Sequence, residues 1–194
     1  MKNNKPKKNH SYRINVPNSL TLSRILCIPV VCIFLSSPGK LNSFLAALCV
    51  SFAFITDILD GFFARKYGAV TVLGKFLDPL ADKILVSVTM IMLIPLNRIQ
   101  VWIVIIIVAR EIAVTGLRAI AASEKIVIQA SPLGKYKTIF QSIALICLCL
   151  HYNFINIDFH VVGMTFLWGA LILTVWSGID YFMSFGKVLS QSVY

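Results

Sequence analysis

Residues 57–82 read DILDGFFARKYGAVTVLGKFLDPLAD, so four aspartates lie between long apolar runs. Outward from this stretch the chain stays apolar. Of its 194 residues, 58% are hydrophobic and 13% are charged, whereas roughly 25% are charged in an average soluble domain. A membrane-spanning helix needs about 20 apolar residues, so the chain has room for roughly six. The composition therefore excludes a soluble globular enzyme, a disordered chain and a collagen-like or disulfide-stapled fold, and it predicts an integral membrane protein.

Six apolar segments are predicted to be transmembrane helices. Breaker residues separate them, at residues 36–39, at Gly68, at Pro95 and Asn97, and at residues 131–134. The first segment follows a basic stretch, as a signal peptide would, but no small-x-small cleavage site ends it and five more segments follow. We therefore expect an all-α bundle of six transmembrane helices, over residues 19–37, 42–65, 74–96, 100–122, 137–156 and 159–185.

The basic residues predict that both termini are cytoplasmic. Twelve Lys and Arg residues fall on the side of the N-terminus, and two, Lys40 and Arg98, fall on the other side. In so apolar a chain, the basic arm before Arg13 is expected to lie near anionic lipid headgroups rather than on nucleic acid. We expect a basic arm with a short interfacial helix over residues 1–18, a membrane domain over 19–187 and a tail over 188–194.

The aspartates of this stretch are half of the acids of the chain: Asp57, Asp60, Asp78 and Asp82. Ionised side chains in hydrocarbon cost several kcal/mol, so such residues are functional candidates. Helix-end anchoring explains them less well, because such anchors are mostly Lys and Arg. Helical spacing puts the first two on one face of the second segment and the last two on one face of the third. The short connection between these segments lets the two faces meet.

Converging carboxylates repel one another unless a cation lies among them. Hard divalent ions with oxygen ligands, Mg²⁺ or Mn²⁺, suit such a site and also bind substrate phosphates. Gly61, Ala64 and Gly74 lie on the same helix faces and would let a phosphorylated ligand approach the backbone. Close packing of helices through small residues explains these three about as well. The residues alone thus predict a divalent-metal site that binds a phosphorylated ligand.

The pattern Asp57-x2-Asp60-Gly61-x2-Ala64-Arg65-x8-Gly74-x3-Asp78-x3-Asp82 resembles the signature of the CDP-alcohol phosphatidyltransferases at every fixed position. The resemblance extends over nearly the whole chain, because that family also has a core of six membrane helices with a cytoplasm-facing site. It implies transfer of a phosphatidyl group from CDP-diacylglycerol to an alcohol, with release of CMP. It also implies a homodimer in the inner membrane of a bacterium.

Three further segments, residues 15–24, 109–118 and 134–141, resemble the bacterial branch of the family whose acceptor is glycerol 3-phosphate. Independently of the family, a phosphorylated acceptor needs cationic partners, and a neutral one needs fewer. Four basic residues are the candidates: Arg110, Arg118, Lys135 and Lys137. Ordinary positive-inside charge explains the two arginines poorly, because both lie within an apolar run.

Two alternative functions remain, and the first is more open than the second. A sister transferase would use inositol phosphate, serine or phosphatidylglycerol as its acceptor. A cation or proton transporter would place its acids near the bilayer midplane and show inverted repeats, and neither feature is seen.

The resemblance assigns two divalent ions to the four aspartates, where they would stabilise charge during an in-line displacement. Asp82 is expected to be either the general base for the acceptor hydroxyl or chiefly a metal ligand. The expected CDP-diacylglycerol contacts are Asn18, Thr21, Asp60, Gly61, Ala64, Arg65 and Gly74. The three histidines of the chain lie outside the signature. That favours direct transfer over a covalent intermediate.

Overall fold

The computed structural model describes the backbone of residues 16–37, 39–67, 72–123, 132–154 and 156–192. Within these residues the chain forms six helices and one short β-hairpin. In chain order they are α1 (Val16–Ser36), α2 (Lys40–Tyr67), α3 (Val72–Leu93), α4 (Val101–Ser123), α5 (Pro132–Leu150), β1 (Asn153–Phe154), β2 (Ile157–Asp158) and α6 (Phe159–Ser192). The all-α prediction is confirmed, apart from this antiparallel hairpin of two-residue strands.

The bounds of α5 differ from the sequence prediction at both ends. The helix begins at Pro132, five residues earlier than predicted, because proline fits the first turn of a helix, where its missing N–H is not needed. It ends at Leu150 rather than at residue 156, and the next residue, His151, has a φ of 59°. α6 is longer than predicted and includes residues 188–192. The predicted arm and interfacial helix fall on residues 1–15, outside the described part, whereas residues 16–18 belong to α1.

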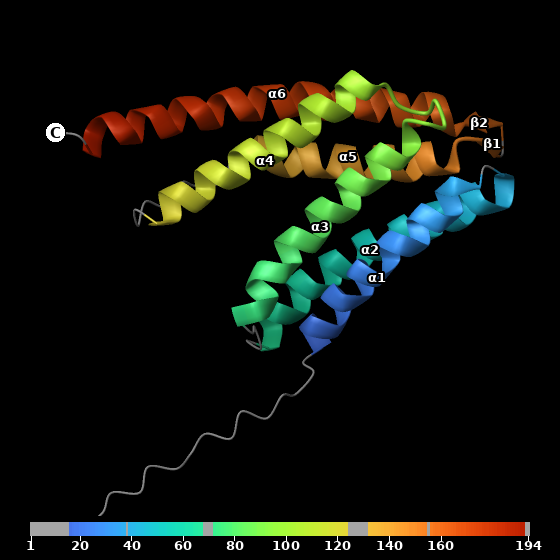
Figure 1. Ribbon diagram of the computed structural model, residues 1–194, viewed down its shortest axis with the longest axis horizontal. Coiled ribbons are helices and arrows are strands. Elements are labelled where there is room, and N and C mark those ends of the chain that lie inside the picture. Colours follow the sequence, from blue (N-terminus) through green and yellow to red (C-terminus); the bar gives the residue numbers. More distant parts are fainter. Residues whose placement is uncertain (1–15, 38, 68–71, 124–131, 155, 193–194) are drawn as a thin grey trace, which may run out of the picture.

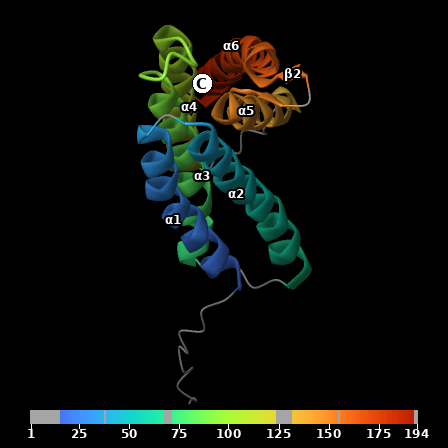
Figure 2. The same cartoon turned by 90° about the vertical axis from the view of Figure 1, so that its right-hand side faces the viewer.

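The helices pack in two groups that touch each other (Figures 1 and 2). In one group α1 packs along both α2 and α3. In the other, α5 packs along α6, to which the hairpin connects it, and α6 also packs against α4. Contacts of α5 with α2 and α3 join the two groups. The first turns of α1 and α3 and the last turns of α2 lie at the same end of the molecule (Figure 1).

All six helices contribute to one apolar core. Its largest fully buried apolar side chains include Val31, Val50, Met90, Ile103, Leu145 and Leu167. Large apolar side chains also cover the outside of the helices, among them Ile33, Ile58, Ile105 and Trp176. A lipid environment suits such an exterior, because an aqueous one disfavours large exposed apolar patches.

Three helices have apolar stretches long enough to cross a membrane within the described residues: Lys40–Leu59, Leu133–Leu150 and Phe159–Gly186. Together with the apolar exterior, these stretches identify a helical membrane protein.

A buried arginine closes the end of the bundle that carries the hairpin. Arg98, in the loop between α3 and α4, is 3% exposed. It donates hydrogen bonds to the carbonyl oxygens of Leu148 (3.3 Å) and Cys149 (2.6 Å) and to Oγ of Ser43 (2.7 Å). Because the last carbonyls of a helix have no partner within the helix, this guanidinium satisfies groups that α5 leaves open.

Candidate functional site

Two of the four signature aspartates meet at one arginine. Nη1 of Arg24 lies 2.8 Å from Oδ1 of Asp57 and 2.6 Å from Oδ1 of Asp82, so α1, α2 and α3 each contribute one residue. The Arg24 side chain is 0% exposed, whereas those of Asp57 and Asp82 are 43% and 35% exposed. Sequence reasoning expected a cation among the carboxylates, but it treated Arg24 only as the last position of the segment 15–24 that resembles the glycerol-3-phosphate branch. It did not predict that Arg24 pairs with the aspartates.

The other predicted donor-site and metal residues fall where the structure describes no side chains. Asp60, Gly61, Ala64 and Arg65 lie in the last turns of α2. Gly74 and Asp78 lie in the first turns of α3, and Asn18 and Thr21 lie at the start of α1. Among the side chains that are described, no group of three or more metal-ligating residues occurs. The backbone therefore brings the predicted segments to one end of the molecule, and the roles of these residues stay predictions.

Asp57 and Asp82 fit a hard divalent ion. Both supply carboxylate oxygens, the ligands that Mg²⁺ and Mn²⁺ prefer. Both are partly exposed while the arginine between them is buried, so a ligand can reach the carboxylates from the open side. Their contacts with Arg24 show that side chains from α2 and α3 converge at one point, as the helical spacing predicted.

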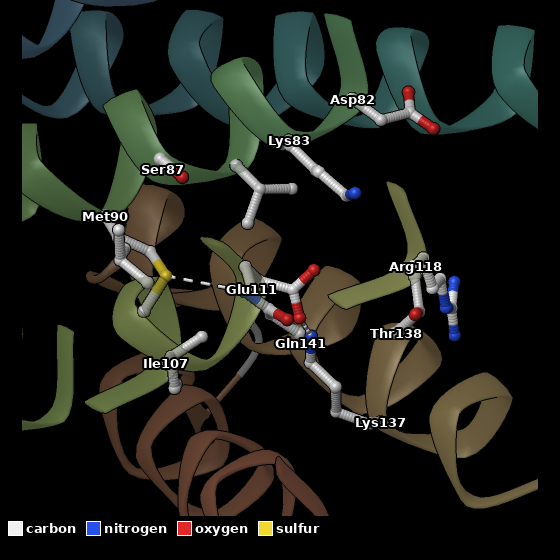
Figure 3. Close-up of a pocket in the computed structure, with 12 residues that line it drawn as sticks. Asp82, Lys83, Ser87, Met90, Ile107, Glu111, Arg118, Lys137, Thr138 and Gln141 are labelled. Atoms are coloured by element: carbon white, nitrogen blue, oxygen red, sulfur yellow. Dashed lines mark hydrogen bonds and ion pairs between the residues drawn. The ribbon is translucent and has the colours of Figure 1, made fainter. Parts of the chain in front are cut away.

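A cavity of about 230 Å³ lies between α3, α4 and α5, and Asp82 of this carboxylate pair lines it. Figure 3 shows Lys83 on α3 at one side of this space, and Glu111 on α4 together with Lys137 and Gln141 of α5 at the other side. Its wall carries three cationic and two acidic side chains: Lys83, Arg118, Lys137, Asp82 and Glu111. Apolar residues, among them Met90 and Ile107, form the rest. Because Asp82 belongs to both, the cavity and the carboxylate pair form one site.

Glu111 connects one cation of the cavity wall, Lys137, with Arg110, which lies outside the lining. Its Oε1 accepts hydrogen bonds from Nζ of Lys137 and, at 3.1 Å, from Nη1 of Arg110. Nη2 of Arg110 donates to Oγ of Ser177 on α6 at 2.9 Å. The Lys137 side chain is 4% exposed, so Glu111 supplies the charge that a buried ammonium needs. Glu111 belongs to the segment 109–118 that resembles the glycerol-3-phosphate branch, but sequence reasoning gave it no role in the site, and the sequence offered no signal for Ser177.

Lys83 is a second cavity residue that sequence reasoning missed. It follows Asp82 directly, and its Nζ donates a hydrogen bond of 2.5 Å to Oγ1 of Thr115, so it bridges α3 and α4 across the cavity.

The structure brings two of the four predicted acceptor-binding residues to the cavity. Arg118 and Lys137 line it, and the guanidinium of Arg118 lies 5.4 Å from the ring centroid of Tyr181. Arg110 does not line it and contacts Glu111 and Ser177 instead. Lys135 is exposed and also lies outside the lining. The binding roles of all four stay predictions.

Two of the three histidines lie at the opposite end of α5 from Lys137. The ring centroids of His151 and His160 are 4.8 Å apart, beside the hairpin. Burial, together with the nearby charges of Arg98 and His160, lowers the pKa of His151. His10 lies outside the described residues. The described histidines are therefore remote from Asp57 and Asp82, and direct transfer stays a prediction.

Comparison with known proteins identifies the family. The family model of the CDP-alcohol phosphatidyltransferases matches residues 14–176. A protein of Bacillus subtilis (strain 168), named CDP-diacylglycerol–glycerol-3-phosphate 3-phosphatidyltransferase, is 41% identical over 194 residues, covering 92% of this chain and 98% of the relative. A protein of the same name from Rickettsia bellii (strain RML369-C) is 42% identical over 174 residues, covering 89% and 96%.

A protein of Mycobacterium tuberculosis (strain CDC 1551 / Oshkosh), named probable phosphatidylglycerophosphate synthase, is 38% identical over 172 residues, covering 86% of this chain and 79% of the relative. The matched range includes Arg24, Asp57, Asp82 and the whole cavity wall, so the similarity covers the site itself. The chain belongs to the CDP-alcohol phosphatidyltransferase family.

Proposed function

We propose that this protein transfers the phosphatidyl group of CDP-diacylglycerol to glycerol 3-phosphate, giving phosphatidylglycerophosphate and CMP. The observation that carries the proposal is the cavity beside Asp57 and Asp82, with its three cationic side chains. The relatives named for this reaction support it, because their similarity extends over most of the chain.

The charge of the cavity favours an acceptor that carries a phosphate. Arg118 and Lys83 extend from α4 and α3, and Lys137 adds a third cation from α5. Two acids, Asp82 and Glu111, balance two of these charges, so the wall keeps a net positive charge. A phosphate dianion, whether of glycerol 3-phosphate or of inositol phosphate, compensates that charge and forms charge-assisted hydrogen bonds, whereas an uncharged alcohol such as inositol would leave the surplus cation without a partner.

The proposed chemistry is a direct displacement. Asp82 lies at the cavity wall and takes the proton from the primary hydroxyl of glycerol 3-phosphate. The hydroxyl oxygen attacks the β-phosphorus of CDP-diacylglycerol, a new P–O bond forms, and the bond to the CMP oxygen breaks. Two divalent ions, Mg²⁺ or Mn²⁺, held by Asp57, Asp60, Asp78 and Asp82, would supply charge neutralisation at the phosphates.

The donor site and the membrane arrangement complete the proposal. Arg65 contacts the donor phosphates, the small residues Gly61, Ala64 and Gly74 line the cytidine pocket, and Asn18, Thr21 and Asp60 add polar contacts. All six helices span the inner membrane of a bacterium, and both termini and the site face the cytoplasm. The transferase domain covers residues 19–187, and two copies form a homodimer.

The test is CMP release by the purified protein in detergent, with CDP-diacylglycerol and one acceptor at a time. We expect release with glycerol 3-phosphate, and little with inositol phosphate, serine or phosphatidylglycerol. Excess chelator should abolish turnover, and Mg²⁺ or Mn²⁺ should restore it. A preference for another acceptor, or full turnover in chelator, would contradict the proposal.

Asp82→Asn separates the two roles of this residue. If Asp82 is the base, turnover should fall by about 10²–10⁴-fold while metal binding persists, because an amide does not accept the proton. Rescue by added Mn²⁺ to near wild-type turnover would instead make Asp82 chiefly a ligand. Asp158→Asn is the matched control at the opposite end. Asp158 accepts hydrogen bonds from the first backbone N–H groups of α6, a role that asparagine also fills.

A further inference from the structure

Arg24 holds an unusual position for an arginine in a membrane helix. It is completely buried, yet its partners Asp57 and Asp82 are both partly open to ligands. One nitrogen, Nη1, contacts an oxygen of each carboxylate. The guanidinium therefore links α2 and α3 from the buried side of the carboxylates, and the exposed side of the carboxylates stays accessible to a ligand.

The three charges depend on one another. A buried guanidinium needs a counter-charge, because removing one partner of a buried ion pair is strongly destabilising. Two neighbouring carboxylates need a cation for the opposite reason, since like charges at close range repel. Among the described side chains, Arg24 meets both needs, because it contacts Asp57 and Asp82 at once.

A divalent ion that binds the same two aspartates must share their oxygen atoms with Arg24. Arg24 already uses an Oδ1 atom of each carboxylate, at 2.8 and 2.6 Å. Its positive charge also repels a second cation at that distance, and the repulsion is stronger in a partly dehydrated site than in water.

We propose that Arg24 competes with the divalent ion for Asp57 and Asp82: it keeps the two carboxylates paired and lowers the affinity of the site for the metal. Arg24 is thus a positioning residue that sets how readily the ion exchanges. The inference rests on the metal-dependent part of the proposed function. It concerns the affinity of the site for the divalent ion, and it does not depend on which acceptor the protein uses.

The first experiment measures thermal unfolding of the detergent-solubilised protein in excess chelator. Arg24→Gln removes the charge, and we expect Tm to fall by about 5–10 °C, because two carboxylates lose their shared partner. Adding Asp57→Asn to that variant should restore at least half of the loss, since one of the repelling charges is then absent. Arg24→Lys keeps the charge and should stay closer to the wild type than Arg24→Gln. Failure of the double variant to recover would overturn the proposal.

The second experiment repeats the unfolding over a series of Mn²⁺ concentrations. The Tm increase caused by Mn²⁺ should be larger in Arg24→Gln than in the wild type at each concentration, and a given increase should be reached at a several-fold lower concentration. An equal or smaller response in Arg24→Gln would show that arginine and metal do not compete.

Arg98→Gln is the matched control for both series. Arg98 is also a buried arginine, but it binds carbonyl and hydroxyl oxygens at the other end of the bundle. Its loss should lower Tm in chelator and leave the Mn²⁺ response at the wild-type value. A Mn²⁺ response in Arg98→Gln as large as that in Arg24→Gln would also overturn the proposal. Failure of the proposed function would show separately, as a wild type that releases no CMP with glycerol 3-phosphate.

Discussion

At the scale of single residues, Glu111 bears the most charge contacts of the cavity wall, because Lys137 and Arg110 both donate to its Oε1. We expect Glu111→Gln to lower the free energy of unfolding by about 1–3 kcal/mol, since the buried ammonium of Lys137 loses its counter-charge. Thermal or denaturant unfolding in detergent measures the change. Lys137→Met in the same chain should recover part of the stability, and a double variant less stable than Glu111→Gln alone would contradict this account.

Arg118 is the residue with which to test the acceptor. Arg118→Ala should raise the KM for glycerol 3-phosphate ten- to a hundredfold and leave the KM for CDP-diacylglycerol within a few-fold. A charge-assisted contact with a phosphate contributes about 1.5–3 kcal/mol. Steady-state kinetics of CMP release with each substrate varied in turn give both constants. Equal effects on both would place Arg118 at the donor instead.

Lys135→Ala provides the comparison for Arg118→Ala. The basic pattern of the sequence predicts an effect of the same kind, but Lys135 is exposed and lies outside the cavity lining. We therefore expect a smaller rise in KM for this variant. A rise as large as that of Arg118→Ala would mean that glycerol 3-phosphate binds outside the 230 Å³ cavity.

The site could be predicted from the sequence only where local spacing decides it. Three- and four-residue spacings bring the carboxylates of each pair to one helix face, and the short connection between the two helices lets these faces meet, so the meeting of Asp57 with Asp82 was foreseeable. The partners of Arg24 lie 33 and 58 residues away. Their contact depends on how α1 packs against two other helices, which no local pattern specifies. Because α5 begins at Pro132, Lys135 and Lys137 are both helical, and residues two positions apart in a helix lie on different faces. Lys135 is therefore exposed and Lys137 is buried, which the predicted start at residue 137 did not indicate.

At the scale of elements, the close packing of α5 on α6 depends on Gly163. A Cβ atom built there would lie 2.8 Å from Cγ of Leu148 and 3.0 Å from its backbone nitrogen. Gly163→Ala should therefore lower the free energy of unfolding by about 1–3 kcal/mol, as overpacking does in other cores. Gly186→Ala, on the same helix, is the control, because nothing lies within 4 Å of its added Cβ. The test compares the thermal unfolding of Gly163→Ala with that of Gly186→Ala. Equal stabilities of the two variants would contradict the packing argument.

The helices themselves were predictable because hydrocarbon leaves the backbone few choices. A spanning segment must satisfy its own N–H and C=O groups, so long apolar runs predict helices. The start of α5 was not predictable in the same way, since Ser131-Pro132 suits a loop as well as a first helical turn. The hairpin between α5 and α6 has two-residue strands. A segment that short contains no alternation to detect.

At the scale of the whole molecule, the proposed orientation is open to a labelling experiment. Single cysteines are introduced at Asn153, an exposed hairpin residue, and at Gly186, an exposed residue near the end of α6. The host chain has its five native cysteines, all free, replaced beforehand. A membrane-impermeant maleimide should label Asn153→Cys in spheroplasts and Gly186→Cys only after permeabilisation. The reverse pattern would place both termini outside.

The buried arginine of α1, Arg24, also affects how the chain enters the membrane during translation. α1 emerges first, and an arginine at the centre of an inserting helix costs about 2.5–3.5 kcal/mol. The carboxylates that pair with Arg24 are synthesised 33 and 58 residues later, which is several seconds at about 5–20 residues per second. Until then the Arg24 side chain must extend toward the lipid headgroups. Insertion of α1 is therefore completed by α2 and α3. A ribosome that stalls before residue 57 leaves Arg24 without either aspartate, and one that stalls before residue 82 leaves it without Asp82.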